Sequence, residues 1–207
     1  ENVMTTNPVN IYEYEAIAKE RLAQGDYDFI AGAATDEITL RRTRAVFDSI
    51  MMKPRMMVDV SQRDLSTTVL GNKIDFPVML DPAGNHGAAH PDGELATAKA
   101  AGAMNTIMAL SSHASRTLED VAEVATGPLW FQYYFFKDRE LTLDMAKRAE
   151  DAGYSALCVT LDAKIKPKRE RNLRNNYVGS VSPNYAHLDL STHTWKFGAD
   201  APAGPSD

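Results

Sequence analysis

The residues best suited to chemistry lie where an apolar run gives way to a basic loop, between residues 156 and 171. The run ends on the hydroxyl of Thr160 and the carboxylate of Asp162, and Arg169 follows. The same loop carries further cations: Lys164, Lys166, Lys168, Arg171 and Arg174. A buried strand that runs into a cationic loop is typical of α/β proteins that bind a small anion. A strand followed by a solvated charge run is the alternative that this stretch leaves open.

Polar side chains also end three earlier apolar runs. They are Asp81, then Ser111, then Gln132 with Tyr134. Because the carboxyl ends of parallel strands meet at one edge of a sheet, these side chains predict a single site shared with Thr160. The sequence contains neither a Gly-x-Gly-x-x-Gly motif nor a Walker loop, which disfavours a Rossmann dinucleotide site and a P-loop NTPase.

The runs that carry these residues alternate with helical patterns. Strands are expected at 76–81, 106–110, 129–134 and 156–162. Helices are expected between them, at 92–102, 118–124 and 139–152. A strand and a helix therefore recur about every 25 residues, which predicts βα units and a parallel sheet.

Residues 1–75 do not follow this alternation. Expected there are a helix over 10–24 that Gly25 stops, a helix capped by Asp36, a short strand at 53–60 and a hairpin at 67–74. Residues 179–207 are rich in Ser, Pro, Asn and Thr and predict a long loop or tail. The expected division is therefore 1–75, 76–178 and 179–207.

The composition describes a globular protein of 207 residues, with 44% hydrophobic and 24% charged residues. The formal net charge of -6 argues against a general nucleic-acid or membrane-surface role. The single cysteine, Cys158, predicts a buried thiol, and no metal site or membrane span is expected. Without a signal-peptide pattern, the default expectation is a cytoplasmic protein.

A set of short motifs runs in order over about residues 10–178. They are Tyr-Asp-Phe-Ile-Ala-Gly-Ala (27–33), Pro-Arg (54–55), Asp-Val (59–60), Thr-Thr-Val-Leu-Gly (67–71), Ala-His-Pro-Asp-Gly-Glu (89–94), Leu-Ser-Ser (110–112), Trp-Phe-Gln-x-Tyr (130–134), Lys-Asp-Arg (137–139), and Thr-Leu-Asp (160–162) with Arg169. The ordered set resembles the FMN-dependent α-hydroxy-acid oxidase and dehydrogenase family, which includes glycolate oxidase, lactate oxidase and mandelate dehydrogenase.

The resemblance implies a TIM (β/α)8 barrel with FMN at the carboxyl ends of its strands. This chain would supply the N-terminal helices and about the first four βα units. Ser111, Gln132 and Thr160 would hydrogen-bond the flavin ring, and the backbone of Ala83 and Gly84 would face it.

The resemblance also implies oxidation of a small 2-hydroxy acid to a 2-oxo acid. Tyr134 would contact the substrate, Asp162 would orient the catalytic histidine, and Arg169 would hold a carboxylate. Phe29 stands where members of the family usually have a tyrosine, and His113 where many have a bulky aromatic residue, so both are assigned to the substrate pocket.

The family's base histidine and carboxylate-binding arginine belong to the second half of the barrel, whose motifs are absent from this chain. Activity is therefore expected only with a C-terminal half, as a second chain or a missing segment, and a homo-oligomer is expected. Two alternatives stay open: a degenerate half-barrel that serves as a structural or binding subunit, and an FMN barrel enzyme acting on 2-amino acids. Phe29 and Asp81 favour the first, since a buried carboxylate before Pro82 needs a partner.

Overall fold

The computed structural model describes residues 7–136, 139–163 and 167–185. The chain packs as two units. The first runs to Asp59 and includes Pro167–Gly179, and the second comprises Val60–Lys166 and the chain from Ser180. These units divide the chain at other points than 1–75, 76–178 and 179–207, a division that stays a prediction for the whole protein.

The first unit is helical. Its helices are α1 (Ile11–Arg21), α2 (Gln24–Ala31), α3 (Ile38–Asp48) and α7 (Glu170–Arg174). Asn10 begins α1, because its Oδ1 accepts hydrogen bonds from the backbone N–H groups of Tyr12 and Glu13 at 3.0 and 3.2 Å. Gly25 does not stop a helix as expected, since it lies in the first turn of α2. A Cβ atom there would lie 3.0 Å from the ring of Tyr177, so a larger residue would crowd that ring.

Two further expectations for this region are wrong. Helix α3 is not capped by Asp36: its N-cap is Glu37, which has a φ of 55° and makes no side-chain capping bond. The strand at 53–60 is absent, and Met56 and Met57 are 81% and 104% exposed. A strand is stable only when it pairs with a neighbouring strand, and this stretch forms no β-bridge to any of the described residues.

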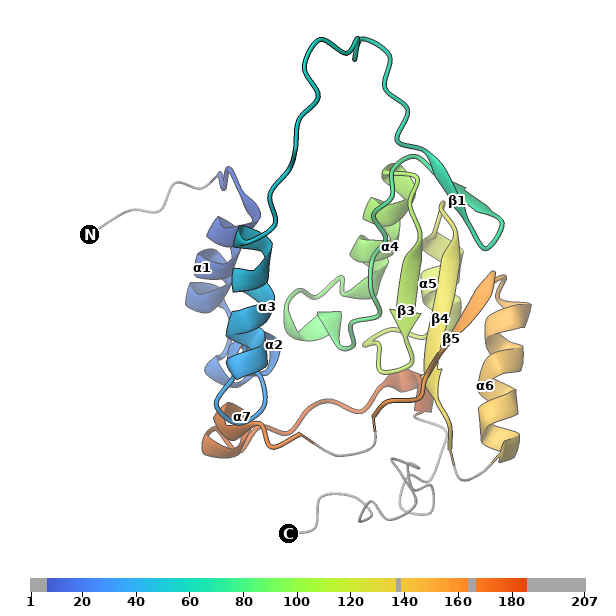
Figure 1. Cartoon of the computed structure of the whole chain (residues 1–207). Coiled ribbons are helices and arrows are strands. Elements are labelled where there is room, and N and C mark those ends of the chain that lie inside the picture. The colour runs from blue at the N-terminus through green and yellow to red at the C-terminus, as the bar shows by residue number, and fades with distance from the viewer. Residues whose placement is uncertain (1–6, 137–138, 164–166, 186–207) are drawn as a thin grey trace. The chain divides into compact units, whose positions relative to one another are not determined.

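The second unit contains the predicted parallel sheet. Its strands β3 (Met108–Ser111), β4 (Leu129–Tyr134) and β5 (Ala156–Thr160) lie in that order. Helices α4 (Glu94–Ala103), α5 (Leu118–Val124) and α6 (Arg139–Asp151) alternate with the strands, and α5 packs between the other two (Figure 1). The βα alternation is confirmed, whereas the sheet does not close into a barrel within the described residues.

The remaining elements of this unit are small. The hairpin of β1 (Thr67–Val69) and β2 (Asn72–Ile74) is confirmed, with its turn at Leu70 and Gly71. The turns η1 (His86–Ala88) and η2 (Pro183–Tyr185) are 3-10 helices. The strand expected at 76–81 is reduced to one parallel bridge between Leu80 and Met108, because the backbone turns back on itself between Phe76 and Val78.

The two faces of the sheet differ in character. On the helix-covered face, Leu110 and Phe131 are both 0% exposed and belong to the hydrophobic core. On the opposite face, Ser111, Gln132 and Cys158 lie at matching positions of the three strands. The alternation along each strand therefore separates the packing residues from the polar ones.

A fully buried carboxylate, Glu94, joins the loop before α4 to the loop after β3. Its Oε1 accepts hydrogen bonds from the backbone N–H groups of His86 and Ser115, both at 2.9 Å, and its Oε2 accepts from the Ser115 hydroxyl at 2.5 Å. Burial raises the pKa of Glu94, but these hydrogen bonds outweigh burial and hold the pKa below its ordinary value.

Replacing Glu94 with glutamine is expected to lower the free energy of unfolding by about 2 kcal/mol at neutral pH, since an amide N–H₂ would face donors. Because the folded-state pKa is lowered, the stabilisation by ionised Glu94 is present above the unfolded-state pKa. It is lost as the pH falls through the folded-state pKa. Urea unfolding of the full-length protein at neutral and acid pH measures both effects. The exposed Glu123→Gln is the control, and equal stability of E94Q and wild type at neutral pH would contradict the account.

Candidate functional site

Three side chains at the carboxyl ends of β3, β4 and β5 form a hydrogen-bonded row, here called the Ser111–Gln132–Thr160 row. The Ser111 hydroxyl donates to Oε1 of Gln132 at 3.1 Å, and Nε2 of Gln132 donates to the Thr160 hydroxyl at 2.7 Å. Ser111 and Gln132 are each 4% exposed. The structure thus brings together the three side chains that the sequence assigned to one site.

The donor left over in this row suits a flavin ring. The Thr160 hydroxyl accepts from Gln132, so its own hydrogen can be donated to another acceptor, whereas the Gln132 amide also bonds to the Tyr134 hydroxyl. An isoalloxazine ring presents carbonyl oxygens and ring nitrogens as acceptors along its edge. A donor at the carboxyl edge of a parallel sheet therefore fits the chemistry of FMN.

Tyr134 and Asp162 continue β4 and β5 beyond the row. Burial raises the pKa of Tyr134, the hydrogen bond with Gln132 lowers it, and the negative charge of Asp162 raises it further, with a net upward shift. The phenol is therefore protonated at neutral pH and can donate a hydrogen bond. Asp162 is exposed.

His113 packs between Tyr134 and the loop that contains Gly84. The imidazole ring meets the Tyr134 ring edge-on, with centroids 5.3 Å apart. Burial lowers the pKa of His113, which favours the neutral ring. A Cβ atom on Gly84 would lie 3.0 Å from Cβ of His113, so a larger residue there would crowd the histidine. The contribution of Ala83 and Gly84 to flavin binding stays a prediction.

Two expectations for the interior of the sheet are corrected. Asp81, expected as a buried carboxylate, is exposed, so it needs no buried partner. Cys158, expected to be buried, is half-buried, because it lies on β5, which within the described residues is an edge strand paired on one side only. Burial is the main cause of the raised pKa of the Cys158 thiol, and the charge of Asp81 adds to it.

The other two predicted site residues, Phe29 and Arg169, lie together in the first unit. The Arg169 guanidinium donates to the backbone oxygens of Phe29 and Gly32 at 3.1 and 3.3 Å, and it stacks 4.9 Å above the Phe29 ring. It thereby places a cation at the carboxyl end of α2, where carbonyl groups lack partners. The Tyr27 hydroxyl donates a hydrogen bond to Glu15 at 3.3 Å.

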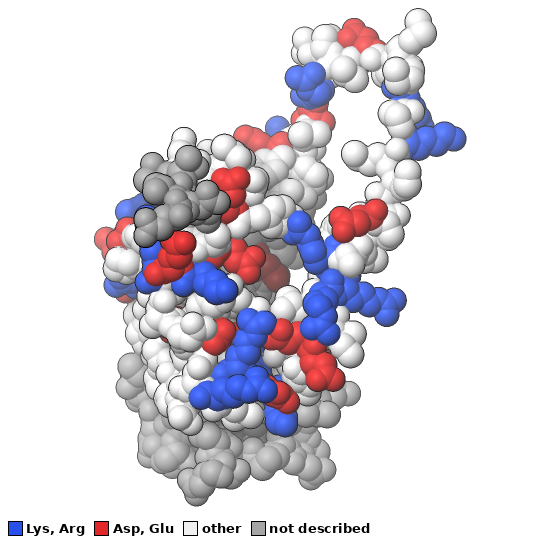
Figure 2. Space-filling view, turned by 90° about the vertical axis from the view of Figure 1, so that its left-hand side faces the viewer, with Lys and Arg blue, Asp and Glu red and all other residues white. Residues whose placement is uncertain are grey.

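Among the described residues of the basic loop, Lys168, Arg171 and Arg174 form ion pairs within the first unit. Arg171 lies 2.6 Å from Glu37 and 3.7 Å from Asp28. Glu170 pairs with both of its neighbouring cations, Arg174 at 2.9 Å and Lys168 at 3.4 Å. Figure 2 accordingly shows basic and acidic side chains interspersed rather than gathered into one basic patch. Lys164 and Lys166 lie outside the described residues.

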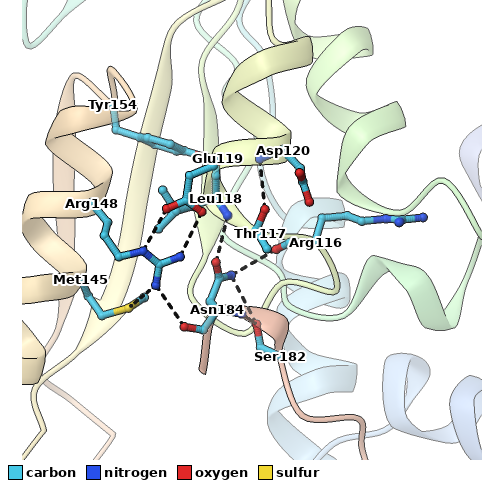
Figure 3. Close-up of polar contacts among 10 residues, drawn as sticks. All are labelled: Arg116, Thr117, Leu118, Glu119, Asp120, Met145, Arg148, Tyr154, Ser182 and Asn184. Carbon is cyan, nitrogen blue, oxygen red and sulfur yellow. Dashed lines mark hydrogen bonds and ion pairs between the residues drawn. The ribbon is translucent and has the colours of Figure 1, made fainter. Parts of the chain in front are cut away.

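Residues 180–185 are the part of the site that sequence reasoning missed. Within the stretch expected as a long loop, Ser182, Asn184 and Tyr185 are 4%, 0% and 2% exposed. Figure 3 shows Asn184 and Ser182 beside the start of α5. A Pro-Asn pair is typical of any turn, so these residue types carried no sign of burial.

The described residues offer neither a metal-binding cluster nor a membrane-spanning helix. No cluster of three or more His, Cys, Asp or Glu side chains has a geometry that would hold a metal ion. None of the described helices has the length and apolar character needed to cross a membrane.

Known proteins resemble this chain over most of its length. The family model for FMN-dependent dehydrogenase matches residues 18–203. An L-lactate oxidase from Nostoc sp. is 43% identical over 206 residues, which are 98% of this chain and 55% of the relative. Glycolate oxidase 3 from Arabidopsis thaliana is 44% identical over 184 residues, which are 87% of this chain and 50% of the relative.

Among solved structures, a soluble mutant of the membrane-associated (S)-mandelate dehydrogenase from Pseudomonas putida matches with a TM-score of 0.83 and 35% identity. The match covers 88% of this chain and 53% of that one. The chain thus spans about half the length of the relatives it matches. The ordered motifs, the parallel βα array and the family model agree: the chain belongs to the FMN-dependent dehydrogenase family.

Proposed function

We propose that this chain is the N-terminal part of an FMN-dependent enzyme that oxidises a small 2-hydroxy acid to a 2-oxo acid. The observation that carries the proposal is the Ser111–Gln132–Thr160 row at the carboxyl edge of the parallel sheet, which leaves the Thr160 hydroxyl hydrogen for a ligand acceptor. The similarity to an L-lactate oxidase and a glycolate oxidase supports the substrate class.

Each residue at the strand ends has a proposed role. A bound FMN would supply the acceptor for the hydride that leaves C2 of the substrate. Ser111, Gln132 and Thr160 hold the edge of the flavin ring. Tyr134, as a protonated phenol, donates a hydrogen bond to a substrate oxygen. Asp162 orients a histidine base from the second half and stabilises its charged form after that base has taken the hydroxyl proton.

The remaining assignments rest on the resemblance. His113 would line the substrate pocket beside Tyr134, and the backbone of Ala83 and Gly84 would face the flavin. Arg169 and Phe29 would belong to the substrate-binding set. Arg169 uses two of its N–H groups on backbone carbonyls, so at most its remaining N–H donors serve a carboxylate.

The open edge of the sheet supports the proposal of a second half. Within the described residues, β5 pairs on one side only. Its Leu157 and Val159 are 44% and 37% exposed, although their neighbours on β4, Phe131 and Tyr133, are 0% and 7% exposed. The next βα unit of a (β/α)8 barrel would pair with β5 and cover this face.

The test uses the protein with both halves present. FMN content and activity are measured against matched pairs of 2-hydroxy and 2-amino acids that share a side chain. We expect bound FMN and turnover of the hydroxy acids alone. Turnover of the amino acids alone would replace the proposed substrate class, and the lack of bound FMN would favour a degenerate half-barrel that acts as a binding subunit.

A further inference from the structure

Residues 180–185, here the 180–185 segment, pack against the loop between β3 and α5. The segment ends in the turn η2, and Asn184 within it is fully buried. A polar side chain removed from water is stable only when hydrogen bonds satisfy it. The partners of Asn184 therefore show what the segment holds in place.

Both ends of the Asn184 amide are used. Its Oδ1 accepts a hydrogen bond from the backbone N–H of Leu118 at 2.9 Å, and its Nδ2 donates to the backbone oxygen of Arg116 at 3.1 Å (Figure 3). Leu118 is the first residue of α5, where N–H groups have no partner within the helix. The conventional cap of this helix is Thr117, which accepts from the N–H of Asp120 at 3.1 Å. Asn184 thus adds a second, long-range cap.

The segment also holds the part of the loop that lies nearer the candidate site. The Ser182 hydroxyl donates to the backbone oxygen of Ala114 at 2.6 Å, and the Tyr185 ring meets the His113 ring edge-on at 5.6 Å. The backbone N–H of His113 in turn donates to the Ser111 hydroxyl at 3.2 Å. A continuous series of contacts therefore leads from the 180–185 segment to the Ser111–Gln132–Thr160 row.

The segment is itself anchored on its other side. The Arg148 guanidinium, from α6, donates to the backbone oxygen of Asn184 at 3.2 Å. The same guanidinium binds both carboxylate oxygens of Glu119 on α5 at 2.9 and 3.0 Å. Such bidentate pairs fix geometry well, so α5, α6 and the 180–185 segment form one support.

We propose that Asn184 is a positioning residue for the candidate flavin site: it fixes the loop between β3 and α5 and so directs the Ser111 hydroxyl within the Ser111–Gln132–Thr160 row. The proposal rests on the proposed function for its consequence, namely FMN binding. It predicts that loss of the amide disturbs the site as well as the stability of α5. A cap with a purely structural role would change stability alone.

The test compares Asn184→Ala with Thr117→Ala in the full-length enzyme. Each variant removes one capping contact from the first turn of α5, but only the first releases the 180–185 segment. We expect N184A to weaken FMN binding by roughly tenfold, by displacing a site residue through its support, and to shift the visible absorption of the flavin. We expect T117A to lower the melting temperature about as much as N184A does, while its FMN dissociation constant stays within about twofold of the wild-type value.

A second readout does not depend on FMN. Amide hydrogen exchange of residues 112–117 is expected to be faster in N184A than in T117A, whereas both variants loosen α5 itself. If N184A fails to fold, Ser182→Ala replaces it, because that variant removes the hydroxyl that binds Ala114. Equal FMN affinities and equal exchange in the two variants would overturn the proposal. A wild-type enzyme without FMN would refute the proposed function, and the exchange comparison would still decide the positioning role.

Discussion

Replacing Gln132 with leucine is expected to abolish stable FMN binding by the full-length protein. Leucine fills a similar volume, but it lacks the amide oxygen that accepts from Ser111 and the amide N–H that donates to Thr160. The buried Ser111 hydroxyl then loses its acceptor, and the proposed flavin site loses the Gln132 amide. At about 1–3 kcal/mol for each lost interaction, the expected loss of affinity is roughly 10²–10³-fold.

A fluorescence titration with FMN measures this loss. Gln62→Leu is the matched control, because Gln62 is an exposed glutamine in the same unit. The control is expected to bind FMN like the wild type. Full flavin occupancy in Q132L, at the same affinity as Q62L, would show that the Ser111–Gln132–Thr160 row does not hold the flavin.

Replacing Asp162 with asparagine is expected to slow substrate oxidation by roughly 10²–10⁴-fold while FMN binding is retained. An amide keeps the size of the side chain but does not stabilise a charged base that has accepted a proton. The same change removes a negative charge that raises the pKa of Tyr134. The Tyr134 phenol is therefore expected to ionise at a lower pH in D162N than in the wild type.

Two measurements separate these effects. Anaerobic stopped-flow absorbance reports the rate of flavin reduction by substrate, and an ultraviolet pH titration reports ionisation of Tyr134. Asp144→Asn, an exposed change on α6, serves as the control for loss of one carboxylate. A D162N enzyme that reduces its flavin as fast as D144N would remove Asp162 from the mechanism.

Local patterns account for the parts of the fold that were predicted well. The apolar runs of β4 and β5 end at polar residues, and a sheet of parallel strands brings such ends together whatever the rest of the chain does. The row of Ser111, Gln132 and Thr160 follows from that rule and was predicted from the sequence. The hydrogen bonds within the row could not be predicted, because they depend on the register of the three strands, and no local sequence pattern specifies that register.

The failures have tertiary causes. The apolar stretch around Met56 has residue types that favour a strand, but it has no partner among the described strands. Without a paired neighbour it does not form a strand, whatever its residue propensities. Asn184 lies in a polar stretch without periodicity, yet it is buried because two backbone groups of a distant loop satisfy its amide. The assignment of Arg169 to an anion rests on the family resemblance and stays a prediction; its guanidinium donates to the carbonyl oxygens of Phe29 and Gly32 at the end of α2.

Anaerobic single turnover tests the central claim most directly. The protein with both halves is mixed with excess 2-hydroxy acid in the absence of oxygen, and the visible absorption of the flavin is followed together with the keto product. The account predicts loss of the flavin absorption with one 2-oxo acid formed per FMN. A flavin that stays oxidised in the presence of every 2-hydroxy acid tested, or a protein that holds no FMN, would contradict it.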